Sequence, residues 1–184
     1  MGRGKVVNEL EKHYSDLHGQ MFEHFTGRSL RPHVEAIKAL IDEHECKTLL
    51  DYGCGGAKLY VEHAVDRVVW GVNAYLYDPN HPKFNELPDH QFDMVVCTDV
   101  LEHIPELCVP DVLHRILTRA RKCVYLNAAE YPAVKTLPNG ENAHVTLRPL
   151  AWWHEALSKA MEFIPVTRKS DLPEVVLNGS KRHA

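Results

Sequence analysis

Several features of membrane, secreted and nucleic-acid-binding proteins are missing from this sequence of 184 residues. No apolar run approaches the roughly 20 residues that cross a bilayer, and the N-terminus lacks the apolar segment of a signal peptide. The five cysteines are odd in number and form no C-x-x-C pair, which is typical of reduced thiols rather than of disulfides or a zinc knuckle. We therefore expect a cytoplasmic protein without a membrane partner.

An excess of basic residues is also missing. The chain has 21 Lys and Arg against 25 Asp and Glu, for a net charge of −4. The one basic cluster, over residues 115–122, is typical of a solvated helix end. A nucleic acid is therefore a disfavoured partner, although composition does not exclude it, and the sequence does not indicate an oligomeric state. The apolar share of 45% and the charged share of 25% fit an ordinary globular domain.

Strand-like apolar runs alternate with amphipathic segments through the middle of the chain. We expect strands over 47–52, 67–72, 92–98 and 123–126, and a final pair over 163–167 and 174–177. Helices are expected over 6–25, 58–64, 110–120 and 151–161, with another opened by Pro32. This alternation predicts a single α/β domain over 1–184 with a mostly parallel sheet, and residues 1–45 are expected to form a helical lid.

The most informative stretch is an apolar run that ends in an acid and continues into glycines, Leu49-Leu50-Asp51-Tyr52-Gly53-Cys54-Gly55-Gly56. It predicts a buried strand followed by a tight turn, where glycines let the backbone approach a nucleotide-like ligand. The third spaced glycine of a dinucleotide fingerprint is missing, and Ala57 stands in its place. A carboxylate at Asp51 repels a pyrophosphate but suits a cationic amino-acid head group, which argues against a nicotinamide oxidoreductase.

This segment resembles motif I of the class I S-adenosylmethionine (SAM) methyltransferases. A second run, Phe92-Asp93-Met94-Val95-Val96-Cys97-Thr98-Asp99-Val100-Leu101-Glu102-His103-Ile104, looks like the fourth-strand segment of small methyltransferases of types 11 and 12. The resemblance covers roughly residues 47–155. It implies a Rossmann-like fold with helices on both faces of the sheet, and SAM as cofactor. The residues expected to bind SAM are Asp51, Tyr52, Gly53, Cys54, Gly55, Asp78 and Asp99, with Asp78 placed to accept the ribose hydroxyls.

The chain departs from that family between Asp78 and Asp93. Only 14 residues separate the two positions, where the standard fold has a helix and a third strand. Pro79, Pro82 and Pro88 also disfavour regular elements there. We therefore expect a sheet trimmed around its third strand, and the adenine contacts stay unassigned.

A second group of polar residues, Asp99, Glu102 and His103, has the i, i+3, i+4 spacing of side chains that can converge on one turn. Together with the later His144, it is similar to the metal-binding E-x-x-E-H turn and distant histidine of small-RNA 3′-terminal 2′-O-methyltransferases. That resemblance implies one divalent ion held by Asp99, Glu102, His103 and His144, and mixed ligands of this kind suit manganese, iron, cobalt or zinc. The alternative is a metal-free turn in which Glu102 and His103 cap and pack the loop. The other histidines, His18 among them, are expected at the surface or in packing.

The sequence thus predicts a SAM-dependent methyltransferase that acts on a hydroxyl, or an amine, of a small-molecule or sugar acceptor. A hydroxyl acceptor needs a general base, for which His103 and His144 are the candidates. One alternative is metal-dependent 2′-O-methylation of a nucleotide or RNA end. Another is a non-catalytic module that binds SAM or a partner.

Overall fold

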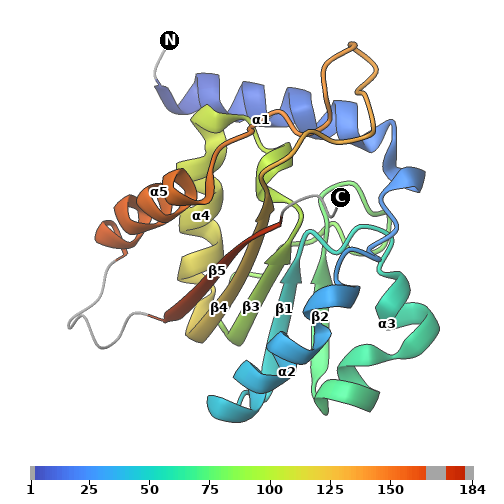
Figure 1. Ribbon diagram of the computed structural model, residues 1–184, viewed down its shortest axis with the longest axis vertical. Helices are drawn as coiled ribbons and strands as arrows, with labels where there is room; N and C mark the ends of the chain where they lie inside the picture. The colour runs from blue at the N-terminus through green and yellow to red at the C-terminus, as the bar shows by residue number, and fades with distance from the viewer. Residues whose placement is uncertain (1–2, 165–172, 181–184) are drawn as a thin grey trace.

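The computed structural model describes residues 3–164 and 173–180, and within them five parallel strands form one sheet (Figure 1). Their order is β2-β1-β3-β4-β5, so the chain leaves β1 toward one side and returns at β3 on the other. The strands are β1 (Thr48–Tyr52), β2 (Asn73–Tyr77), β3 (Phe92–Thr98), β4 (Ala120–Ala129) and β5 (Glu174–Ser180). The carboxyl ends of all five strands therefore lie at the same edge of the sheet.

Helices cover both faces of this sheet, and one further helix crosses its carboxyl edge (Figure 1). The elements are α1 (Arg3–Gly19), α2 (Val34–Glu43), α3 (Lys58–His63), α4 (Val109–Thr118) and α5 (Leu150–Glu162). Buried side chains of α4 and α5 belong to one core cluster, and those of α2 and α3 belong to a second. Helix α1 lies across the carboxyl edge, beside the loop that follows β4.

Strand β3 shows why the sheet is buried on both faces. Each of its residues is buried, and successive side chains point to opposite faces. Val95 and Cys97 lie in the cluster with α4 and α5, whereas Met94 and Val96 lie in the cluster with α2 and α3. A continuous apolar run is typical of a central parallel strand that has a helical layer on each side.

The trimmed sheet is confirmed, because residues 78–91 between β2 and β3 contain neither helix nor strand. The strand expected over 67–72 is wrong. Residues 66–70 form a π-helical turn that ends at Gly71, whose φ is 71°, and β2 begins only at Asn73. The apolar residues there follow a helical pattern, since Val68 is 75% exposed while Trp70 is buried.

Other boundaries also differ from expectation, and β4 extends over 120–129 instead of 123–126. Helix α1 ends at Gly19, and a separate 3-10 turn covers Phe22–His24. The expected strand over 163–167 is not seen at Phe163 and Ile164, which follow α5, and its remainder lies outside the described residues. The strand expected at 174–177 is confirmed and continues to Ser180, paired in parallel with β4.

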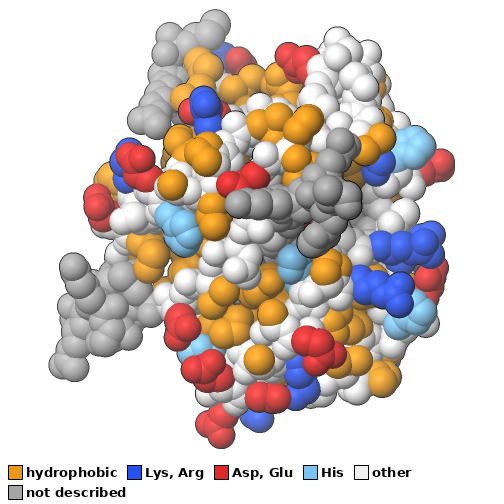
Figure 2. Space-filling model, viewed as in Figure 1, with side chains coloured by type: hydrophobic (Ala, Val, Ile, Leu, Met, Phe, Trp, Pro, Cys, Tyr) orange, Lys and Arg blue, Asp and Glu red, His pale blue; other side chains and the backbone are white. Residues whose placement is uncertain are grey.

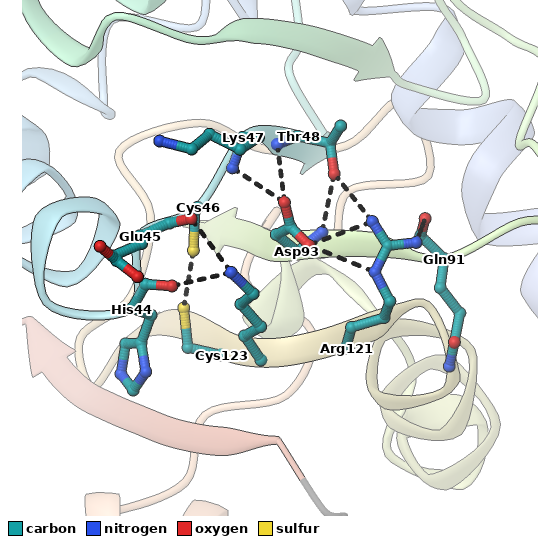
Figure 3. Close-up of polar contacts among 10 residues, drawn as sticks. His44, Glu45, Cys46, Lys47, Thr48, Gln91, Asp93, Arg121 and Cys123 are labelled. Carbon is teal, nitrogen blue, oxygen red and sulfur yellow. Dashed lines mark hydrogen bonds and ion pairs between the residues drawn. The ribbon is translucent and has the colours of Figure 1, made fainter.

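An ionic clamp joins the amino ends of three strands (Figure 3). One carboxylate oxygen of Asp93 accepts the N–H groups of Lys47 and Thr48 at 2.8 and 3.1 Å, and the other accepts from Arg121 at 3.1 and 3.2 Å. Burial alone raises the pKa of Asp93, but these hydrogen bonds outweigh it and hold the pKa below its ordinary value. The clamp thus ties β1, β3 and β4 together at the end of the sheet opposite α1.

Replacing Asp93→Ala should lower the free energy of unfolding at pH 7 by about 2 kcal/mol, because Arg121 and two backbone N–H groups lose their acceptor. Since the folded-state pKa is depressed, this stabilisation is present above the unfolded pKa of about 3.9 and is lost as pH falls through the folded value. Urea unfolding at pH 7 and at pH 3 measures both effects. The exposed Asp89→Ala variant is the control, and an Asp93→Ala effect no larger than the control contradicts the clamp.

Candidate active site

A cavity of about 470 Å³ opens at the carboxyl edge of the sheet, beside the point where the strand order reverses. Its walls come from the ends of β1, β2 and β3, from α1 and the following segment, and from the loop after β4. Ligands of open α/β sheets bind at this topological switch point. Five of the seven residues expected to bind the cofactor line the cavity, namely Tyr52, Gly53, Gly55, Asp78 and Asp99.

The turn after β1 carries two glycines in left-handed conformations, with φ of 91° at Gly53 and 52° at Gly55. A Cβ on Gly55 would lie 2.7 Å from the carbonyl oxygen of Phe25, and the N–H of Gly56 donates to that same oxygen at 2.7 Å. The turn therefore has to be free of side chains for the segment around Phe25 to pack on it. The sequence-based interpretation assigned the space beside these glycines to the ligand alone.

Asp78 bridges the first and second strand ends. Its Oδ2 accepts the N–H of Gly55 at 3.0 Å, and its Oδ1 accepts the N–H of Asn80 at 2.9 Å. Burial nevertheless raises the pKa of this carboxyl above its ordinary value. The carboxylate faces the cavity with acceptor capacity left on both oxygens, because each oxygen can accept a second hydrogen bond.

Asp51 and Cys54 are not among the residues that line the cavity. Asp51 is buried at 3% exposure, and this burial raises its pKa to about 7. Cys54 is buried at 3% exposure as well. The Cys54 side chain packs in the core cluster with α2 and α3. A direct contact of Asp51 or Cys54 with the cofactor stays a prediction.

Asp99 follows β3 and lines the same cavity. It adopts φ of 53°, a conformation that costs a non-glycine residue about 1–3 kcal/mol and is commonest at functional sites. Its Oδ1 is buried without a hydrogen-bond partner among the described residues. Burial raises the pKa of this carboxyl to about 6, although a hydrogen bond with Ser29 opposes the shift.

The next turn and the loop after β4 bring together Glu102, His103 and His144. One potential metal-ligand atom from each residue lies within 4.8 Å of the others, and Asp99 is not part of this group. The loop reaches the turn because Thr146 donates its N–H to the carbonyl of Glu102 at 3.0 Å. Its hydroxyl also donates to the carbonyl of Ile104 at 2.6 Å.

A backbone hydrogen bond orients each of these three side chains. The N–H of Ala129 donates to Glu102 Oε1 at 3.0 Å, which leaves the buried Oε2 without a partner among the described residues. His103 Nδ1 lies 2.8 Å from the carbonyl oxygen of Ala143, and His144 Nδ1 lies 2.6 Å from that of Tyr131. Because a carbonyl only accepts, both Nδ1 atoms carry protons and both Nε2 atoms of the neutral rings keep a lone pair.

The electrostatics of the group fit a cation. Burial and the neighbouring Asp99 raise the pKa of Glu102 to about 8. Burial, with His18 and His144 nearby, lowers the pKa of His103 to about 3, and burial also lowers that of His144. Two imidazoles with lowered pKa values and a buried carboxyl, each with a backbone hydrogen-bond partner, are the types of ligand and supporting contact that transition-metal sites use.

The sequence predicts residues 1–45 as a lid, but it did not identify which of their side chains reach the cavity. His18, which was expected at the surface or in packing, lines the cavity and contacts His103. Phe25 packs edge-on against His103 with ring centroids 5.4 Å apart, and Lys135 lies 4.6 Å above the Phe25 ring. No spacing signal could have found these residues, because His18 and His103 are 85 positions apart. Whether residues 1–45 move as a lid stays a prediction.

An all-parallel Rossmann-like sheet with an acid and a glycine turn at its switch point is typical of enzymes that bind a nucleoside cofactor. A family model described as a methyltransferase domain matches residues 11–172, and the chain belongs to that family. It is accordingly a class I SAM-dependent methyltransferase. Searches of curated proteins and of solved structures gave no significant match. Among the described residues, no helix is both long and apolar enough to span a membrane.

Asp78→Ala should weaken SAM binding at least about tenfold, because it removes a ligand acceptor and leaves the Gly55 N–H without its partner. Titration calorimetry with SAM and with methionine measures the effect, and the exposed Asp89→Ala on the same connection is the control. A role at the ribose predicts a smaller loss for methionine, which has no ribose, than for SAM. Equal losses for SAM and methionine would show that Asp78 acts only by holding the turn.

Proposed function

We propose that this methyltransferase acts on a hydroxyl of a small-molecule or sugar acceptor, held in the same cavity beside Glu102, His103 and His144. SAM supplies a methyl group that its sulfonium makes electrophilic, so the protein has to align the hydroxyl with the S–CH₃ bond, accept its proton and exclude water. The observation that carries the proposal is that Glu102, His103 and His144 each bring one potential ligand atom within 4.8 Å of the others. One of these side chains, Glu102, has a buried carboxylate oxygen without a hydrogen-bond partner among the described residues.

We further propose that Glu102, His103 and His144 hold one divalent ion, with manganese, iron, cobalt and zinc the metals that suit these ligands. Three protein ligands with open positions are typical of catalytic rather than structural sites. An ion there would lower the pKa of an acceptor hydroxyl, as bound metals do for water. If the site works without metal, a neutral Nε2 of His103 or His144 is the general base, because both nitrogens are free of the backbone hydrogen bonds.

Charge and shape favour a small acceptor over a nucleic acid. Lys and Arg side chains lie among Asp and Glu rather than in a stripe on the face that Figure 2 shows. The cavity is also walled by α1 and the loop after β4, which suits a compact acceptor. Methylation of a nucleotide or RNA end is the second candidate, favoured by the Glu102, His103 and His144 donor set. Asp99 lies outside that set, which departs from the small-RNA enzymes.

His144→Ala should reduce affinity for Co²⁺ by more than about a hundredfold, since losing a ligand costs more than the roughly 10–100-fold of losing its hydrogen-bond partner. SAM affinity should stay within about twofold, because loss of a metal ligand leaves the backbone and carboxylate contacts of the cofactor site in place. Visible absorption during Co²⁺ titration and calorimetry with SAM measure the two affinities. The exposed His154→Ala variant is the control. Full activity after chelation would remove the metal from the proposal and leave the general-base role.

The acceptor class is tested with methyl-labelled SAM and four panels: sugars and polyols, phenols, small amines, and RNA with a free 3′ end. Transfer to a hydroxyl in the first two panels supports the proposal, and transfer to RNA alone favours the second candidate. Transfer to amines alone contradicts hydroxyl chemistry. SAM binding without transfer to any panel would favour a non-catalytic module.

A further inference from the structure

We propose that His18 of α1 is a positioning residue that holds the His103 ring with its Nε2 lone pair facing the cavity. The inference deepens the proposed function and rests on it for its consequence in metal binding. The tautomer of His103 follows from hydrogen bonds, and its orientation follows from hydrogen bonds and ring contacts.

The protonation pattern follows from which atoms can donate. Each ring nitrogen of His18 lies near a carbonyl oxygen, Nδ1 at 2.8 Å from that of Tyr14 and Nε2 at 3.2 Å from that of Ala143. A neutral ring carries one proton, and the shorter contact places it on Nδ1, which leaves Nε2 as an acceptor. That Nε2 lies 3.1 Å from His103 Nδ1. The His103 Nδ1–H therefore faces two acceptors, His18 Nε2 and the Ala143 carbonyl. If His103 carried its proton on Nε2 instead, both hydrogen bonds would be lost. The lone pairs of His103 Nδ1 and His18 Nε2 would then face each other at 3.1 Å.

Ring packing fixes the same orientation. The His18 and His103 centroids are 5.0 Å apart with their planes at 86°, and the His103 and His144 centroids are 4.8 Å apart at 87°. The Phe25 and His103 centroids are 5.4 Å apart at 83°. Three aromatic rings therefore pack edge-to-face with His103, and such packing favours one orientation of its ring.

Helix α1 can impose this geometry because it is tied to three other parts of the fold. Glu11 forms an ion pair with Arg115 of α4. Ser15 donates to Asn80 at 3.3 Å, and Tyr14 donates to Glu141 in the loop after β4 at 2.7 Å. His18 is therefore presented from a braced helix, and a partner held in this way orients a ligand better than a side chain on a free loop does.

The test compares His18→Leu, which keeps bulk but removes the acceptor, with His18→Gln, whose amide oxygen can take the place of Nε2. His13→Leu is the control, since His13 is exposed on the same helix. In the absence of a methyl acceptor, the affinity for Co²⁺ should fall about 10–100-fold in His18→Leu. In His18→Gln it should recover to within about threefold of the unsubstituted chain. With a methyl acceptor identified from the four panels, kcat should fall in His18→Leu while the KM for SAM stays within about twofold.

A second readout does not depend on metal or activity. Long-range ¹H–¹⁵N spectra of histidine-labelled protein should show His103 as the Nδ1–H tautomer in the unsubstituted chain. They should show line broadening or a second tautomer in His18→Leu.

An Nε2–H tautomer of His103 in the unsubstituted chain overturns the proposal. Co²⁺ affinity in His18→Leu equal to that of His13→Leu overturns it as well. Equal losses in His18→Leu and His18→Gln would show that ring packing, not the acceptor, matters, and would also overturn it. If the unsubstituted chain binds no Co²⁺, the proposed metal fails and the tautomer spectra alone decide the role of His18.

Discussion

Parallel pairing of the strands is the constraint on which the rest of this molecule depends. Because all strands of the described sheet run the same way, every chain segment that leaves a strand does so at one edge, and polar residues far apart in sequence meet there. Strand β3 supplies the central position and is buried along its whole length. The site is thus built from loops and turns, whereas its position is set by a rigid, fully buried core.

The same edge concentrates carboxylates in a poorly solvated place. Burial raises the pKa of Asp51, Asp78, Asp99 and Glu102, so the fold holds four acidic groups where their charged forms are disfavoured. Carboxyl groups with raised pKa values are typical of a functional site. Ionising several of them in one buried place costs free energy unless a bound cation offsets it. A cofactor with ammonium and sulfonium charges, and a divalent ion, are ligands of the sign that relieves this cost.

Helix α1 and the loop after β4 complete the cavity from outside the sheet. They share a small buried cluster of Leu17, Leu137 and Ala143, and the Tyr14–Glu141 hydrogen bond adds a polar link. The carbonyl oxygen of Ala143 in this loop also accepts a hydrogen bond from His103 Nδ1–H. The glycine turn, His103 and α1 with the segment that follows it are therefore connected by direct contacts, so a substitution in α1 can change the surroundings of His103.

The sequence by itself determined the parts of this protein that are written in local patterns. The run from Leu49 to Gly56 defined the first strand and its turn, the unbroken apolar run after Phe92 defined the buried central strand, and the prolines between Asp78 and Asp93 indicated the trimmed sheet. These signals work because side-chain period and backbone restriction act over a few residues. The pairing of Glu102 and His103 with His144 was within reach because strand ends share an edge.

Only the tertiary structure decided the rest. Local propensity could not separate a buried strand from the π-helical turn at 66–70, because the apolar residues Val68 and Trp70 suit either one and the choice depends on what packs against them. Asp99 lies outside the group of Glu102, His103 and His144. Its φ is 53° and the 3-10 turn begins only at Leu101, so the helical spacing assumed for Asp99 does not apply. His18 enters the site through a contact across 85 positions, and no sequence period records a contact of that range.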